Sequence, residues 1–120
     1  MTVLLASLAA LLLQGTAPTV GDTVWLSRAI AVPAGHAVRA ADWEPDDPVE
    51  LLGRARVSMR GDSAMIAYPA VFWRPGQHLV ELPGPLLLGP GGTVDSLRSE
   101  RVRLDIRRVW PTVPNDSVLS

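Results

Sequence analysis

A loop rich in carboxylates is the densest group of potential metal ligands in this chain. Its five acidic residues are Asp42, Glu44, Asp46, Asp47 and Glu50. Carboxylate oxygens are the ligands that calcium prefers, so the loop could order around one ion. However, Pro45 and Pro48 replace flexible positions of a calcium-binding loop, and no glycine stands at the sixth position. A solvated acidic loop is the simpler interpretation, and we assign no metal ligand and no cofactor to the chain.

A second motif is Arg60-Gly61-Asp62-Ser63, at the tip of a predicted hairpin. It contains the Arg-Gly-Asp tripeptide of adhesion ligands, but Gly-Asp is also what a tight turn requires. The run from Gly61 to Ala64 is similar to the nucleophile block of certain esterases. Such an enzyme needs a strand-to-helix turn and a partner histidine, and neither His36 nor His78 has that setting. The sequence therefore predicts no catalytic residue and a non-enzymatic protein.

The charge pattern argues against a nucleic-acid partner. The chain has 11 basic and 12 acidic residues, and the formal net charge is −1. Residues 98–108 are rich in arginine, but Glu100 and Asp105 interrupt them, as expected for the solvated face of a strand.

Tryptophans are the remaining candidates for a binding surface. Trp25 lies on the polar side of its predicted strand, and Trp43 lies in the acidic loop. An exposed indole can stack on a sugar ring or on the side chains of a protein partner. In the alternative interpretation Trp25 packs under a loop, and Trp73 and Trp110 close the ends of the fold. We select Trp25 and Trp43 as candidate contacts with a protein or a glycan.

Short strands must position these side chains. The 11 prolines and 10 glycines fall between apolar runs, which favours strands and turns over helices. The predicted strands cover residues 23–32, 37–40, 49–52, 55–60, 63–73, 79–82, 86–88 and 101–109. Seven to eight short strands at this spacing predict an all-β fold, an antiparallel immunoglobulin-like β-sandwich.

The predicted strand over residues 63–73 and the turn after it allow the most specific structural predictions. It is apolar on both faces, as is typical of a central strand, yet Pro69 cannot donate a ladder hydrogen bond and predicts a bulge or an edge position. Pro75-Gly76 then predicts a type II turn with a positive φ at the glycine. We expect His78, which follows this turn, to serve packing or capping.

The start of the chain has the composition of a targeting signal. Residues 3–13 are almost all alanine and leucine, and they are shorter than the ~20 residues of a spanning helix. We predict a signal peptide over residues 1–17, a β-sandwich over 18–110 and a polar tail over 111–120; the alternative makes the apolar run a first core element. Because no cysteine follows and no later run could span a membrane, we expect a periplasmic or secreted protein without disulfides.

Four runs of residues together resemble one type of module. They are Val20-Gly21-Asp22-Thr23-Val24, Val49-Glu50-Leu51-Leu52-Gly53, Trp73-Arg74-Pro75-Gly76-Gln77-His78 and Gly91-Gly92-Thr93-Val94-Asp95-Ser96. The module resembles the immunoglobulin-like repeats in the extracytoplasmic parts of BatD-type aerotolerance proteins. The resemblance implies a bacterial, non-catalytic, periplasmic component of a membrane-attached assembly, and it transfers no functional residue to this chain, which has one such module.

Two functions are compatible with these observations. The first is an exported binding or assembly module that contacts a protein of the cell envelope. The alternative is a carbohydrate-binding β-sandwich that uses Trp25 or Trp43, with a calcium-ordered acidic loop.

Overall fold

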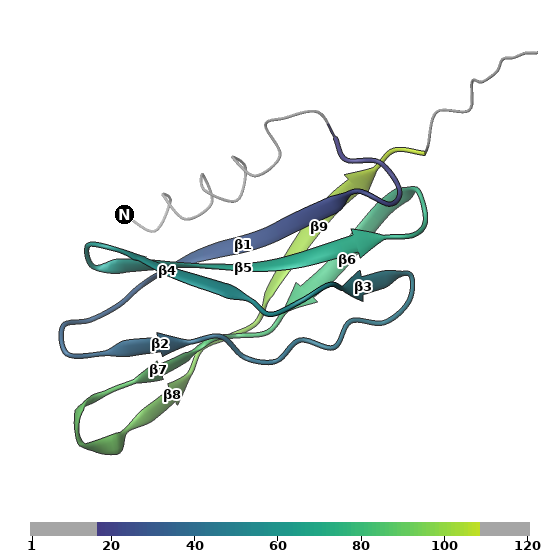
Figure 1. Ribbon diagram of the computed structural model, residues 1–120. Coiled ribbons are helices and arrows are strands. Elements are labelled where there is room, and N and C mark those ends of the chain that lie inside the picture. The colour runs from purple at the N-terminus through teal and green to yellow at the C-terminus, as the bar shows by residue number, and fades with distance from the viewer. Residues whose placement is uncertain (1–16, 109–120) are drawn as a thin grey trace, which may run out of the picture.

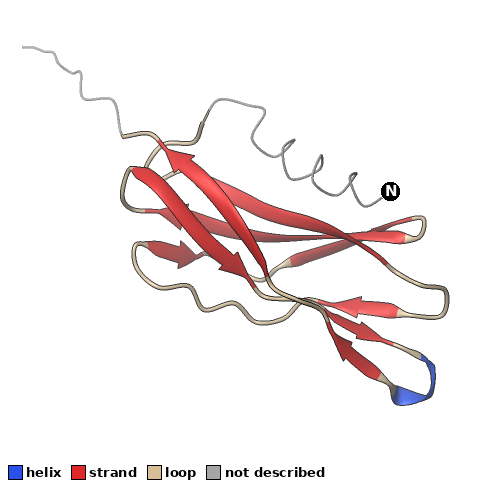
Figure 2. Cartoon of the chain, turned by 180° about the vertical axis from the view of Figure 1, so that it is seen from behind, coloured by secondary structure: helices blue, strands red, loops and turns tan. Residues whose placement is uncertain are grey.

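A computed structural model describes residues 17–108. Residues 1–16 of the predicted signal peptide, Trp110 and the predicted tail lie outside the described residues. The described chain forms nine β-strands and one short 3-10 helix (Figures 1 and 2), so the all-β prediction is confirmed. The elements are β1 Thr23–Ala31, β2 Ala37–Arg39, β3 Val49–Leu51, β4 Arg56–Arg60, β5 Ser63–Phe72, β6 Gly76–Leu82, β7 Leu86–Leu88, η1 Pro90–Gly92, β8 Val94–Ser96 and β9 Glu100–Ile106.

The strands form three antiparallel sheets. In the first sheet β5 is central: β1 pairs along one edge, and β4 and then β3 pair along the other. The second sheet contains β6 and β9, and the third contains β2, β7 and β8. Leu82 lies opposite Glu100 in the second sheet, and Leu86 lies opposite Ser96 in the third. The residue numbers of each pair have the same sum, so the register of β6 with β9 continues in that of β7 with β8. The pairs β6–β9 and β7–β8 are therefore two parts of one long hairpin, interrupted at Pro83-Gly84-Pro85.

The first and second sheets share one apolar core. From the first sheet it receives Leu26, Ile30, Ile66, Tyr68 and Phe72, and from the second Val80, Leu82, Leu104 and Ile106. This arrangement is compatible with a β-sandwich. At the other end Val57 and Met59 of β4 lie on the inner face beside Ile66 and Ala64, yet they remain exposed. The two layers are therefore open at β4.

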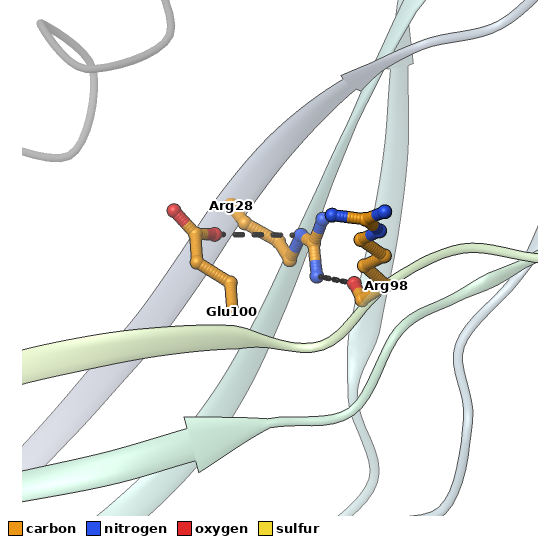
Figure 3. Close-up of polar contacts among 3 residues, drawn as sticks. All are labelled: Arg28, Arg98 and Glu100. Atoms are coloured by element: carbon orange, nitrogen blue, oxygen red, sulfur yellow. Dashed lines mark hydrogen bonds and ion pairs between the residues drawn. The ribbon is translucent and has the colours of Figure 1, made fainter.

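A half-buried cation also links the two layers (Figure 3). Arg28 is the one charged residue on the inner face of β1, and its Nη1 donates to the carbonyl oxygen of Arg98 at 2.8 Å. Its Nε lies 3.5 Å from Oε1 of Glu100, the first residue of β9. Since burying an unpaired guanidinium would be costly, the carboxylate and the carbonyl offset the loss of water around it.

Pro69 lies inside the central strand β5. The irregularity that it predicts occurs in the neighbouring strands, because the pairing with β5 passes from β4 to β3 beside this residue. The N–H of Leu52 donates to the carbonyl oxygen of Pro69 at 2.8 Å, so the main-chain polar atoms of Pro69 face the β3–β4 side. There residues 52–55 separate β3 from β4. The missing N–H of Pro69 therefore removes no ladder bond to β1.

The positive φ predicted for the glycine after β5 is confirmed. Gly76 has φ +107°, and Nε2 of His78 donates to the carbonyl oxygen of Arg74 at 2.8 Å, with the ring 5.0 Å from that of Phe72. The expectation of capping by His78 is confirmed. Residues 94–96, which lie outside the predicted strands, form β8. All three are exposed, so no apolar alternation marks that strand.

The segment before β1 pairs with the second sheet. Thr19 forms a parallel bridge with Arg107, and Val20 N donates to Arg107 O at 3.0 Å. The Asp22 carboxylate accepts hydrogen bonds from Thr19 N and Thr19 Oγ1, both at 2.9 Å. These two bonds, with a smaller contribution from the charge of Arg107, hold the pKa of Asp22 below its ordinary value.

We expect Gly76→Ala to lower the free energy of unfolding by about 1–3 kcal/mol, because side chains resist positive φ. A Cβ at Gly76 would meet nothing within 4 Å, so the loss reflects backbone strain. Gly53→Ala is the matched control: φ is not positive there, and the nearest atom would lie 3.9 Å away. Equal urea midpoints for both variants would contradict the positive φ at Gly76.

We expect the stabilisation by Asp22 to disappear in acid. Because the folded-state pKa is lowered, the contribution is complete above the unfolded pKa of about 4 and is lost as the pH falls through the folded value. The stability difference between wild type and Asp22→Ala, measured by urea unfolding, should therefore shrink between pH 6 and pH 3. Val94→Ala, on exposed β8, is the control: it removes no titratable group, so its stability difference should not change with pH. A constant difference for Asp22→Ala would contradict the carboxylate–Thr19 contact.

Candidate functional site

The face of the first sheet that points away from the core carries the strongest candidate site. Residues directly opposite one another in a ladder share a face. Trp25 lies opposite Pro69, and Glu50 lies opposite Val71. Arg56 lies opposite Ala67, on the same side of β5. We call this surface the outer face; Trp25, Glu50 and Arg56 are exposed on it, and exposed Trp73 follows directly after β5.

Trp25 is 38% exposed on the outer face, as the sequence predicted from its polar side of β1. The guanidinium carbon of Arg56 lies 4.4 Å from the centroid of its ring, in the geometry of a cation–π contact. Arg56 therefore holds the indole and occupies part of the ring surface on which a sugar would stack.

Trp73 was not selected from the sequence, yet it is more exposed, at 53%. Its Nε1 donates to Oε1 of Glu50 at 2.9 Å, which fixes the indole beside the outer face. The interpretation that Trp73 closes one end of the core is therefore wrong. Strand periodicity contained the signal: Phe72 faces inward, so the next residue should face outward.

Trp43 was selected from the sequence as an exposed contact, but it is buried, with 8% of its surface exposed. Its ring meets that of Tyr68 edge to face, with centroids 5.5 Å apart. The hydroxyl of Tyr68 donates to Ala41 O at 2.7 Å, and burial raises the pKa of this phenol. The prediction that Trp43 is an exposed contact is corrected, because the loop that carries it folds onto β5.

The residues of the other candidate catalytic motifs, Ser63 and the two histidines, do not form one site. Ser63 Oγ donates to Arg60 O at 3.1 Å, within the hairpin turn at Gly61. His78 packs near Phe72, at the opposite end of β5 from Ser63, and Nδ1 of His36 donates to Ala34 O. Within residues 17–108 no three His, Asp or Glu side chains are placed to hold a metal ion.

Two hollows flank the core. A cavity of about 460 Å³ lies between the acidic loop and β6, with Asp46, Asp47 and His78 among its lining residues. A groove of about 1000 Å³ lies under β4, with Val38, Leu52, Val57 and Leu88 along its walls. The groove follows from the open end of the two layers, where the inner face of β4 is uncovered.

In the described part of the chain, no helix has the length and apolar character needed to cross a membrane. Comparison of the chain with protein-family models, with curated proteins and with solved structures finds no match.

Proposed function

We propose that this protein is an exported, non-enzymatic module that binds a protein of the cell envelope through the outer face. The observation that carries the proposal is that two exposed indoles lie on one sheet face, each held by a charged side chain. The apolar run at residues 3–13 supports export. The resemblance to BatD-type repeats supports an immunoglobulin-like module and a partner in the envelope.

The outer face has the properties of a binding surface. Tryptophan is enriched among the residues that dominate binding energy, since a large ring buries much surface for little lost freedom. Arg56 and Glu50 restrict Trp25 and Trp73 before any partner arrives, which reduces the entropy lost on binding. Their opposite charges would also orient a partner of complementary pattern.

A glycan is the second candidate, and the exposed indole of Trp73 is what favours it. Trp43 no longer supports this function, because it is buried. Trp25 supports it less than a bare ring would, because Arg56 lies over it.

We expect Trp25→Ala and Trp73→Ala each to weaken capture of the envelope partner about tenfold or more, because hot-spot tryptophans contribute about 2 kcal/mol each. The measurement is affinity capture from detergent-solubilised envelopes of the source cells, with the bound protein identified by mass spectrometry. Leu79→Ala is the matched control, because Leu79 is 57% exposed but lies on β6 of the second sheet.

Partner retention by the double tryptophan variant would contradict the proposal, as would an equal loss with Leu79→Ala. Retention of the wild type on cell-wall polysaccharide, abolished by Trp73→Ala, would instead establish the glycan function.

A further inference from the structure

The edge of β1 that faces away from β5 is open. Within residues 17–108 β1 pairs with β5 alone. Val32 N donates to Asp62 O at 2.8 Å, which continues the β1–β5 register, so even-numbered residues of β1 direct their main-chain groups toward β5. Because the direction alternates along a strand, the N–H and C=O groups of the odd-numbered residues face the open edge. They are Thr23, Trp25, Ser27, Ala29 and Ala31.

Within residues 17–108, the path of the chain leaves this edge accessible. Residues 18–20 pair with Arg107, the residue directly after β9, and Gly21, with φ +90°, turns the chain into β1 from there. Open edges are commonly protected by proline, lysine, a bulge or an inward charge. β1 has no proline or lysine, and its register with β5 is continuous over nine residues. Its one inward charge, Arg28, is already paired with Glu100.

We propose that a second copy of this chain completes the edge, with the two β1 strands antiparallel about a two-fold axis at Ser27. This is the register that pairs the whole of Thr23–Ala31 with its copy. Ser27 then faces Ser27 of the second copy, and the large Trp25 faces the small Ala29 of the second copy. Five pairs of edge-facing residues would exchange two bonds each, giving about ten new main-chain hydrogen bonds.

The same register also places compatible side chains opposite each other on the inner face of the two β1 strands. Leu26 would lie opposite Arg28 of the second copy, so no two arginines are directly opposed. Each Arg28 keeps its own contacts with Arg98 and Glu100, and pairing therefore introduces no unpartnered charge. The outer faces of the two copies would form one continuous surface that carries both Trp25 side chains. This inference rests on the edge of β1 and stands whether or not the outer face binds an envelope protein.

Disulfide trapping tests the register directly, because the chain contains no cysteine. In a hydrogen-bonded antiparallel pair the Cα atoms lie about 5.5 Å apart, which is within disulfide range. We expect Ser27→Cys to form covalent dimers at least tenfold faster than Ala29→Cys or Leu79→Cys under the same mild oxidant. Residue 29 would face residue 25 of the second copy, and residue 79 lies on β6. Equal rates for Ser27→Cys and Leu79→Cys would overturn the proposal.

Charge reversal at the two-fold axis gives an independent test by analytical ultracentrifugation. We expect a concentration-dependent dimer for the wild type and monomers for Ser27→Lys and Ser27→Glu separately, because like charges would face each other. An equimolar mixture of the two variants should recover the dimer. A wild type that is monomeric at every concentration would overturn the proposal, as would folded variants that each dimerise like the wild type.

Discussion

The fold depends on the requirement that β5 be hydrogen-bonded along both edges and covered on its inner face. Each of its ten residues is buried or half-buried. β1 satisfies one edge, while β4 and β3 share the other and separate beside Pro69, where no donor is available. The second sheet covers the inner face of β5 by contributing to the same apolar core. The candidate site is on the other face of this strand and its neighbours.

The second sheet covers only part of the inner face of the first sheet, and β4 is left exposed on that face. The long hairpin packs on the first sheet through β6 and β9, and it changes at Pro83-Gly84-Pro85 into the third sheet. A Cβ at Gly84 would overlap the carbonyl oxygen of Leu97, so the two sides of the hairpin approach too closely there for any side chain. Beyond this point the inner face of β4 is uncovered, which creates the groove. Arg28 links the layers on the covered side.

Local patterns predicted the elements well, and long-range contacts decided what the patterns could not. Alternation identified β9, and the proline–glycine pair identified the turn before β6, because both signals are contained within a few residues. The exposed β8 had no apolar face to reveal it. The burial of Trp43 depends on Tyr68, which is distant in sequence, so the composition of its acidic loop misled us. Trp73 was predictable from strand alternation and was missed because we expected it to close the core.

The open β1 edge and the aromatic outer face are the two surfaces on which the proposals rest, and the state of the edge can be measured most directly. Amide hydrogen exchange resolved by NMR reports each N–H of β1 separately. In dilute protein Leu26, Arg28 and Ile30 should be protected, while Trp25, Ser27 and Ala29 should exchange rapidly and become protected as concentration rises. Trp25, Ser27 and Ala29 amides that are as protected as their neighbours at every dilution would contradict an open edge, and amides that never gain protection would contradict its pairing with a second copy.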